Sequence, residues 1–353
     1  MSRTFTLMLL MILLVVVNAT SQSIERQVIG SAGTTLSNAT VTLDFTIGEP
    51  VITTITNGTA IVSQGFHQGS LMLAIKVNPV VFLQGPALNP NSGEESLMRD
   101  DLRVASYIPN TSPYIDGLVV DNSILTTTGA NAIVDWVFVE LRDATTNTTI
   151  VDSQSGLLQR DGDIVGVDGV SDLEFDQPAG NYFVAIKHRN HLGMMTSTAI
   201  SLSSTTTALD FTDGSVTTYG TNAQTTIGTP TGVSAMWAGD ANDDSKINLI
   251  GSPNDNREIT DVILNDPLNI FGLYGFSVAG YTQVDMNLSG DAQIIGTNND
   301  VRLINDNILN NPSNIFGLYG FTITEQLPEV VSSKQMARDK ALLAKAKSLT
   351  KEQ

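Results

Sequence analysis

The chain has 353 residues, with 36 acidic side chains, 18 basic side chains and no cysteine, and its formal net charge at pH 7 is −18. This length is sufficient for two or three domains, and 41% hydrophobic residues with only 15% charged residues is typical of a folded protein rather than a disordered one. The acidic balance repels nucleic acid and anionic lipid and attracts divalent cations, so we expect no nucleic acid partner.

Residues 1–21 are predicted to be a secretory signal peptide. Arg3 precedes an apolar run from Leu7 to Val17, and small residues such as Ala19 follow it. This order is typical of a signal peptide. The run has about 11 residues, whereas a membrane-spanning helix needs about 20, so the alternative of a transmembrane helix is disfavoured. We expect no transmembrane segment once the signal peptide is removed.

Residues 22–76 and 77–232 predict a mainly β protein. In residues 22–76, apolar and polar residues alternate with period two, which predicts a small antiparallel sheet with a tight hairpin at Asn57 and Gly58. In residues 77–232 we expect a central β-sandwich, with a short helix near Glu94–Val104. The clearest alternating segments of this second region are residues 132–143, 157–167 and 180–190.

Residues 233–328 contain an internal repeat. The segment 284–301 aligns with 239–256 at a constant offset of 45, and each copy continues into the sequence NIFGLYGF. Each unit is predicted to be an acidic loop, a short helix with one apolar face that ends before Pro267 or Pro312, and an apolar exit. One unit is too small to bury NIFGLYGF alone, so we expect the two units to pack face to face.

The two acidic loops are candidate calcium sites. Calcium takes six to eight oxygen ligands, and a D-x-[DN]-x-[DN] pattern supplies side-chain oxygens at alternate positions and a carbonyl at the seventh. Gly251 and Gly296 stand at the twelfth position, where a carboxylate is expected, so the closing carboxylate is predicted four residues later. The predicted ligands are Asp240, Asn242, Asp244, the Lys246 carbonyl and Asp255 in the first loop, and Asp285, Asn287, Ser289, the Asp291 carbonyl and Asp300 in the second.

The alternative interpretation is two solvated turns in which Asp255 and Asp300 cap the helices that follow. The absence of cysteine favours calcium, because an exported domain without disulfides needs either a good core or a bound metal.

Several stretches carry a family resemblance. They are VIGSAGTTLSNATVTLDFTIGEPV, FLQGPAL, VDWVFVELRD, LLQRDGDIVGVDGV, YFVAIKHRNHLGMM, AMWAGDANDD and TITEQLP. The chain resembles secreted and cell-surface haemagglutinin- or adhesin-like proteins of Bacteroidetes over nearly all of residues 24–328, and its C-terminal pair of units is similar to the dockerin type I calcium repeat. The resemblance implies a location outside the cell or on the outer surface of a Gram-negative bacterium, bound calcium, and adhesion to a surface protein or glycan. Residues 329–353 are predicted to be a basic helical tail.

Three other features have a structural and a functional interpretation. His188 and His191 follow a predicted strand, so local hydrogen bonding at a strand end is favoured over a metal or catalytic role. The segment 161–172 contains four aspartates among glycines, and hairpin turns are favoured over a cation site because Val165 and Val167 stand where ligands are needed. Trp136 is predicted to be a core residue rather than a platform for a sugar.

No common catalytic motif is present, including G-x-S-x-G, H-E-x-x-H and G-x-x-x-x-G-K-[ST]. We therefore expect a non-catalytic binding or adhesion protein. The alternative of a glycosidase, which needs only two carboxylates at the right separation, stays open. The alternative function is a docking component of an extracellular carbohydrate-degrading assembly. An exposed patch on the repeats favours docking, whereas burial of NIFGLYGF favours a structural role.

Overall fold

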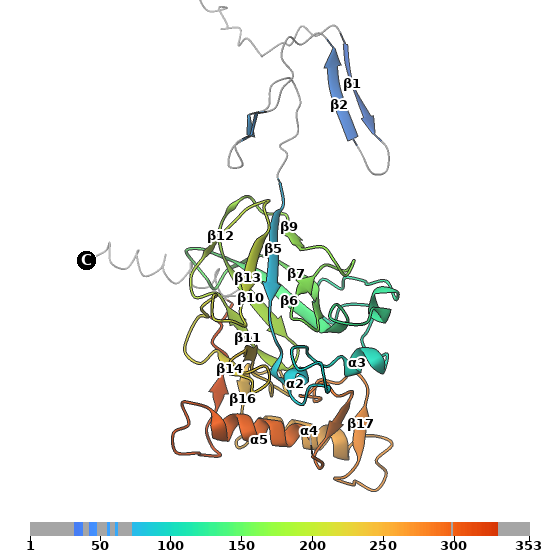
Figure 1. Cartoon of the computed structure of the whole chain (residues 1–353), viewed down its shortest axis with the longest axis vertical. Coiled ribbons are helices and arrows are strands. Elements are labelled where there is room, and N and C mark those ends of the chain that lie inside the picture. Colours follow the sequence, from blue (N-terminus) through green and yellow to red (C-terminus); the bar gives the residue numbers. More distant parts are fainter. Residues whose placement is uncertain are drawn as a thin grey trace, which may run out of the picture. The chain divides into compact units, whose positions relative to one another are not determined.

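The computed structural model describes residues 32–37, 42–47, 55–56, 61–62, 73–297 and 299–330, and the chain divides into two compact units, residues 1–71 and 72–353 (Figure 1). The predicted signal peptide, the turn at Asn57 and Gly58, and residues 331–353 of the predicted tail lie outside the described residues.

The described residues of the first unit form two antiparallel strand pairs. β1 (Ala32–Ser37) pairs with β2 (Thr42–Ile47), and β3 (Ile55–Thr56) pairs with β4 (Ile61–Val62). The expected antiparallel pairing in this region is confirmed, as two separate pairs.

The second unit is mainly β and is built around a six-stranded antiparallel sheet. Its strand order is β11 (His191–Met195), β10 (Gly180–His188), β6 (Ile133–Asp143), β7 (Ile150–Gln159) and β8 (Ile164–Val165), and β12 (Ile200–Leu202) also pairs with β10. β6 lies in the middle, and all its residues except Asp143 are buried. A central strand that is covered on both faces needs a nearly continuous apolar sequence, which IVDWVFVEL supplies.

A three-stranded sheet shares its hydrophobic core with the six-stranded sheet. It is formed by β13 (Thr207–Asp210), β5 (Ile75–Val80) and β9 (Leu173–Phe175), and β13 runs parallel to β5. Trp136 is completely buried in this core, and its indole Nε1 donates a hydrogen bond to the Pro109 carbonyl (2.8 Å). The prediction that Trp136 is a core residue is confirmed.

The helix predicted near Glu94–Val104 is shorter than expected. Only α3 (Asp101–Val104) is helical, and the other short helices of this region are α2 (Gln84–Ala87) and η1 (Ile124–Thr126). The N–H groups of Met98 and Arg99 donate to the distant carbonyls of Arg160 (2.8 Å) and Pro86 (2.9 Å). Because these donors are used in long-range contacts, they are not available for helical hydrogen bonds.

The repeats form the end of the second unit at which α4 (Asp255–Leu264) and α5 (Asp300–Asn310) lie (Figure 1). β16 (Lys246–Ile247) in the first loop pairs with β19 (Ile323–Thr324), which follows the second helix. β17 (Ser277–Ala279), which follows the first helix, pairs with β18 (Asp291–Gln293) in the second loop. β14 (Gln224–Thr226) and β15 (Ser234–Met236) form a further pair before the repeats. Each repeat therefore completes a small sheet of the other.

The two helices pack through the predicted apolar faces. Ile259 and Ile263 of α4 and Ile304 and Ile308 of α5 are all fully buried in one cluster. Both helices end before Pro267 and Pro312, as predicted.

A buried polar network, which we call the junction network, connects the six-stranded sheet to the repeats. Asp135 on β6 accepts hydrogen bonds from the Tyr281 hydroxyl (2.7 Å) and from Arg189 Nε (3.1 Å), and it contacts His188 Nε2 (3.1 Å). The guanidinium of Arg189 lies 4.3 Å from the centre of the Tyr281 ring. Burial raises the pKa of Asp135, but Arg189 and His188 outweigh it and hold this pKa at about 2, so the carboxylate is ionised.

His188 ends β10 and His191 begins β11, and both side chains belong to the junction network. Their Nδ1 atoms lie 3.0 Å apart, and His191 Nε2 accepts the N–H of Gly85 (3.1 Å). Burial lowers the pKa of both imidazoles, so both are neutral at pH 7. The predicted location at strand ends is confirmed, and the hydrogen bonds are local between the two histidines but long-range to Asp135 and Gly85.

Substitution Asp135→Ala should lower the free energy of unfolding by about 3–5 kcal/mol, because it leaves the buried Arg189 cation without its anion. Asp121→Ala, on the exposed surface, is the control and should change it by less than about 1 kcal/mol. Urea denaturation followed by circular dichroism measures both. A loss below about 1 kcal/mol for Asp135→Ala would show that the junction network contributes little.

Candidate functional site

The two acidic loops have the same backbone conformation. In the first, the carboxylate of Asp240 accepts the N–H groups of Asp244 (3.0 Å) and Ser245 (2.9 Å). In the second, the carboxylate of Asp285 accepts the N–H groups at the corresponding positions (3.0 and 2.8 Å). The left-handed residues also correspond, and they are Asp243, Ser245, Leu288 and Gly290. The repeat seen in the sequence is therefore a repeat of structure.

The second aspartate of each loop closes it from the start of the helix. The carboxylate of Asp255 accepts the N–H groups of Ala241 and Asn248, both at 2.7 Å. Asp300 accepts those of Met286 and Gln293, also at 2.7 Å. A carboxylate from the first turn of each helix thus reaches back to both sides of its loop. Its role as the closing calcium ligand stays a prediction.

Asp255 and Asp300 do not cap the helices, so that part of the alternative interpretation is wrong. The N-caps are Asn254 and Asn299, whose side-chain oxygens accept the N–H groups of Arg257 and Arg302, both at 2.8 Å. Asparagine is as good a cap as aspartate, and it leaves the next residue free to turn inward.

Each loop contains two buried carboxylates. Asp255, Asp285 and Asp300 are 0% exposed and Asp240 is 5% exposed. Burial, together with the charge of Asp255, raises the pKa of Asp240 to about 7, and burial raises that of Asp255 to about 6.

The two buried carboxylates of the second loop also have raised pKa values. Burial raises the pKa of Asp285 to about 6, although Arg189 opposes this shift, and burial with the charge of Asp285 raises the pKa of Asp300 well above its ordinary value. Among residues 73–297 and 299–330, no basic side chain forms an ion pair with any of these four carboxylates.

The first loop also holds two buried oxygens without a hydrogen-bond partner. They are Oδ1 of Asp244 and Oδ1 of Asn248. Counted from Asp240, these residues stand at the fifth and ninth positions, which both supply ligands in calcium loops of this type. An unpartnered buried acceptor costs about 1–3 kcal/mol, and a cation satisfies it. Asn248 was not among the ligands predicted from the sequence, although its spacing from Asp240 identifies it.

Among the other predicted ligands, the two asparagines make corresponding contacts, whereas Ser289 has a contact of its own. Asn242 Oδ1 and Asn287 Oδ1 accept the N–H groups of Asp244 (3.2 Å) and Ser289 (2.8 Å). The Ser289 hydroxyl donates to the carbonyl of Asp291 (3.2 Å), so this candidate ligand carbonyl already has a partner. The side chain of Lys246 is exposed, and its backbone lies in β16.

Each loop contains oxygen atoms of several kinds that could bind a cation. No group of three or more His, Asp or Glu side chains placed to hold a metal ion occurs in the described part of the chain. The donor set is instead paired carboxylates with amide, hydroxyl and carbonyl oxygens. These are hard ligands of the kind that calcium takes, and the set in the first loop is richer because Asp244 corresponds to Ser289.

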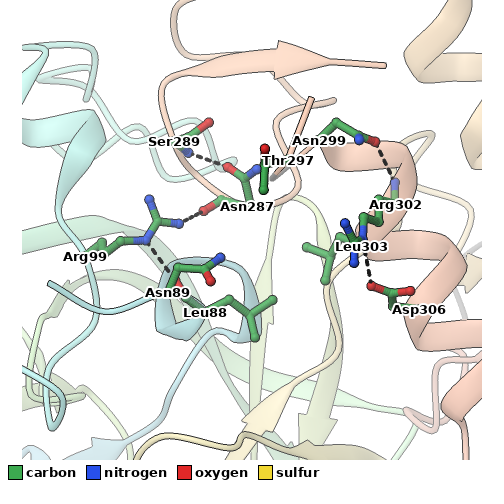
Figure 2. A pocket seen from close by; sticks show the side chains of 10 residues that line it. All are labelled: Leu88, Asn89, Arg99, Asn287, Ser289, Thr297, Asn299, Arg302, Leu303 and Asp306. Carbon is green, nitrogen blue, oxygen red and sulfur yellow. Dashed lines mark hydrogen bonds and ion pairs between the residues drawn. The ribbon is translucent and has the colours of Figure 1, made fainter. Parts of the chain in front are cut away.

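A cavity of about 470 Å³ lies beside the second loop (Figure 2). Arg99 lines one side and donates through Nη2 to the Asn287 carbonyl (2.8 Å). The ion pair between Arg302 Nε and Asp306 (3.5 Å) lines the other side. Asn287 and Ser289 also line this cavity, so it gives solvent a route to the second loop.

NIFGLYGF is not buried between the repeats, so the predicted face-to-face packing of this sequence is wrong. Phe271 and Phe316 are 79% and 80% exposed, and among the apolar residues of each copy only the last, Phe276 or Phe321, packs against the helix cluster. The isoleucines of α4 and α5 already fill the space between the helices.

Comparison with protein-family models, with curated proteins and with solved structures finds no match to this chain. No helix among the described residues is long and apolar enough to cross a membrane. Function is therefore inferred from the chemistry of the loops and of the surface around them.

In the presence of chelator, we expect the folded state to lose stability as the pH rises from about 5 to 8. The raised pKa of Asp240 means that the folded state keeps a proton that the unfolded chain releases above about pH 4, so the stability is lost as the pH rises through about 7. Asp240→Asn carries a fixed cost but does not titrate there. Its free energy of unfolding relative to wild type should therefore improve by about 1–2 kcal/mol between pH 5 and pH 8, measured by urea denaturation. A difference that is independent of pH would contradict this expectation.

Proposed function

We propose that the chain is a secreted or surface-associated, non-catalytic binding or adhesion protein whose C-terminal repeats are stabilised by calcium. The observation that carries the proposal is the first loop, where two buried carboxylates repel each other and two buried oxygens lack partners. A bound divalent cation neutralises the two carboxylates and also coordinates the two oxygens that lack partners.

The first loop would hold calcium through Asp240, Asn242, Asp244, Asn248, the Lys246 carbonyl and Asp255. The second would use Asp285, Asn287, Ser289, the Asp291 carbonyl and Asp300. Bound calcium supplies the positive charge that neutralises the buried carboxylates. The aspartates themselves hold the loop backbone in its left-handed turns and connect it to the first turn of each helix.

The finer parts of the architecture belong to the same proposal. The shared core of the six- and three-stranded sheets supports a β-sandwich in residues 77–232. Two loop–helix units with exchanged strand pairs support a dockerin-like repeat pair in residues 233–328. The engagement of His188 and His191 in the junction network supports a role without catalysis.

The exposure of NIFGLYGF favours repeats that contact an outside partner over repeats that only support the chain. A docking component of an extracellular carbohydrate-degrading assembly is therefore the second candidate function. Both candidates place the contact surface on the repeats and both need ordered loops.

Calcium should raise the melting temperature of residues 22–353. At 100 times its dissociation constant a ligand stabilises the folded state by about 2.7 kcal/mol, which corresponds to a shift of about 4 °C for a protein of this size. Asp255→Asn should remove most of the shift that arises from the first loop. Differential scanning calorimetry with millimolar calcium and then with chelator measures both effects.

Asp261→Asn is the matched control, because Asp261 is an exposed aspartate on the same helix, two turns from the loop. It should keep the calcium shift. A melting temperature that is indifferent to calcium in wild type would show that the loops are turns without a bound cation.

Ser289→Asp should strengthen the second loop, because it restores the carboxylate that the first loop has at Asp244. In chelator, the added charge beside Asp285 and Asp300 should lower stability by about 1 kcal/mol, whereas the calcium affinity should rise about tenfold. Ser289→Ala, which removes the hydroxyl oxygen and adds no charge, should leave the stability in chelator nearly unchanged and should lower the affinity. Competition with a chromophoric chelator measures the affinity, and an affinity that both variants leave unchanged would exclude a ligand role for this position.

A further inference from the structure

The two copies of NIFGLYGF present large apolar side chains to solvent in equivalent ways. We call residues 267–276 and 312–321 the apolar loops. The exposed fractions match pairwise, at 77% and 78% for Ile270 and Ile315 and at 79% and 80% for Phe271 and Phe316. Leu273, Leu318, Tyr274 and Tyr319 are 54–57% exposed. A soluble surface seldom carries so many exposed apolar side chains close together without a function.

These side chains are held outward by a buried asparagine in each loop. Asn269 Nδ2 donates to the carbonyls of Ile263 (2.8 Å) and Leu273 (3.0 Å), and its Oδ1 accepts the N–H of Leu273 (2.7 Å). Asn314 makes the same three bonds in the second loop, at 2.7, 3.0 and 2.8 Å. Gly272 and Gly317 share a left-handed φ of +59°, which completes each turn. The loops are therefore built in one conformation before any partner binds.

Charge narrows the choice of partner. The apolar loops carry no charged side chain, but the chain as a whole carries −18. A second copy of the chain or an anionic lipid surface would be repelled at long range. The charge of the chain therefore favours a partner surface that has no net charge and an apolar interior that the loop side chains can enter.

The side chains themselves favour lipid over a protein pocket. Protein–protein hot spots are enriched in Trp, Tyr and Arg and depleted in Leu, whereas each apolar loop presents Ile, Phe and Leu with a single Tyr and no Arg. Ile and Phe, at 77–80%, are more exposed than the amphipathic Tyr and the Leu beside it, at 54–57%. This order agrees with a bilayer surface, where tyrosine prefers the headgroup level and the most protruding apolar side chains lie deeper.

We propose that the two apolar loops insert into the surface of an uncharged, zwitterionic lipid bilayer, so that the repeats anchor the protein peripherally by two equivalent contacts. Both loops belong to the end of the second unit that α4 and α5 form (Figure 1). Two shallow insertions reinforce each other, because the second occurs at the high effective concentration set by the first. The inference deepens the proposed binding function by naming its partner, and it rests on that proposal.

The test is flotation of residues 22–353 with phosphatidylcholine vesicles, with and without 30% phosphatidylserine, in the presence of calcium. Phe271→Ser and Phe316→Ser should each lower the partition coefficient about tenfold, and the double variant about a hundredfold, because burial of one phenyl side chain contributes about one order of magnitude or more. Ile115→Ser and Val170→Ser, 94% and 75% exposed but outside the loops, are matched controls and should partition like wild type. Ser313→Leu, which copies Leu268 of the first loop, should increase partitioning several-fold.

Because the chain has no native cysteine, Phe271→Cys gives a single labelling site for an environment-sensitive dye. Its emission should shift to the blue on phosphatidylcholine vesicles if the loop enters the bilayer.

Absence of binding to phosphatidylcholine, or equal binding by the double phenylalanine variant, would overturn the lipid inference. Dimers in sedimentation experiments without lipid that the double variant abolishes would also overturn it, in favour of self-association. Calorimetry with calcium on the same samples separates the two proposals. A retained calcium shift without vesicle binding rejects only the lipid inference, and vesicle binding without a calcium shift rejects only the calcium sites.

Discussion

The structure of the C-terminal repeats depends on two pairs of buried aspartates. In each pair, one carboxylate holds the left-handed turn of the loop, and the other connects the loop backbone to the first turn of a helix. These hydrogen bonds attach the first turns of α4 and α5 to the acidic loops and therefore help to position the apolar loops that follow the helices. The same burial raises the pKa of all four carboxylates, so the ionised form of each costs free energy in the folded state. A cation that removes this cost without disturbing the hydrogen bonds is the simplest resolution, and it is what we propose.

The repeats share their buried polar groups with the β-sheets. Asn190, between β10 and β11, donates to the carbonyl of Asp285 at 2.7 Å. Gln84 of α2 and Asn307 of α5 exchange two side-chain hydrogen bonds, at 2.6 and 2.8 Å. Gly85 lies so close to the backbone of Met286 that a Cβ at this position would clash with its carbonyl. The conformation of the second acidic loop is thus coupled to the packing of the sheets, so a change in this loop should also alter that packing.

Local patterns allowed much of this structure to be predicted. The strand segments around Trp136, the apolar faces with Ile259 and Ile304 and the ends of both helices all depend on residues near in sequence. The predictions that were wrong failed because long-range contacts, or competition between neighbouring residues, determined the structure. The helix near Glu94 is interrupted because its N–H groups bond distant carbonyls, and asparagine caps each helix because the neighbouring aspartate is drawn into the loop. The face-to-face packing of NIFGLYGF failed because the isoleucines of both helices, together with apolar residues from the neighbouring loops and strands, already form the buried cluster, and no local pattern shows how much space remains.

Direct calcium titration of residues 22–353 by isothermal calorimetry, after exhaustive removal of metal, tests the central claim most directly. We predict saturable binding to two sites of unequal affinity, with Asp244→Ala eliminating the tighter site and leaving the weaker one. Absence of saturable heat at millimolar calcium, or binding that Asp244→Ala leaves unchanged, would contradict the proposal that these loops are calcium sites.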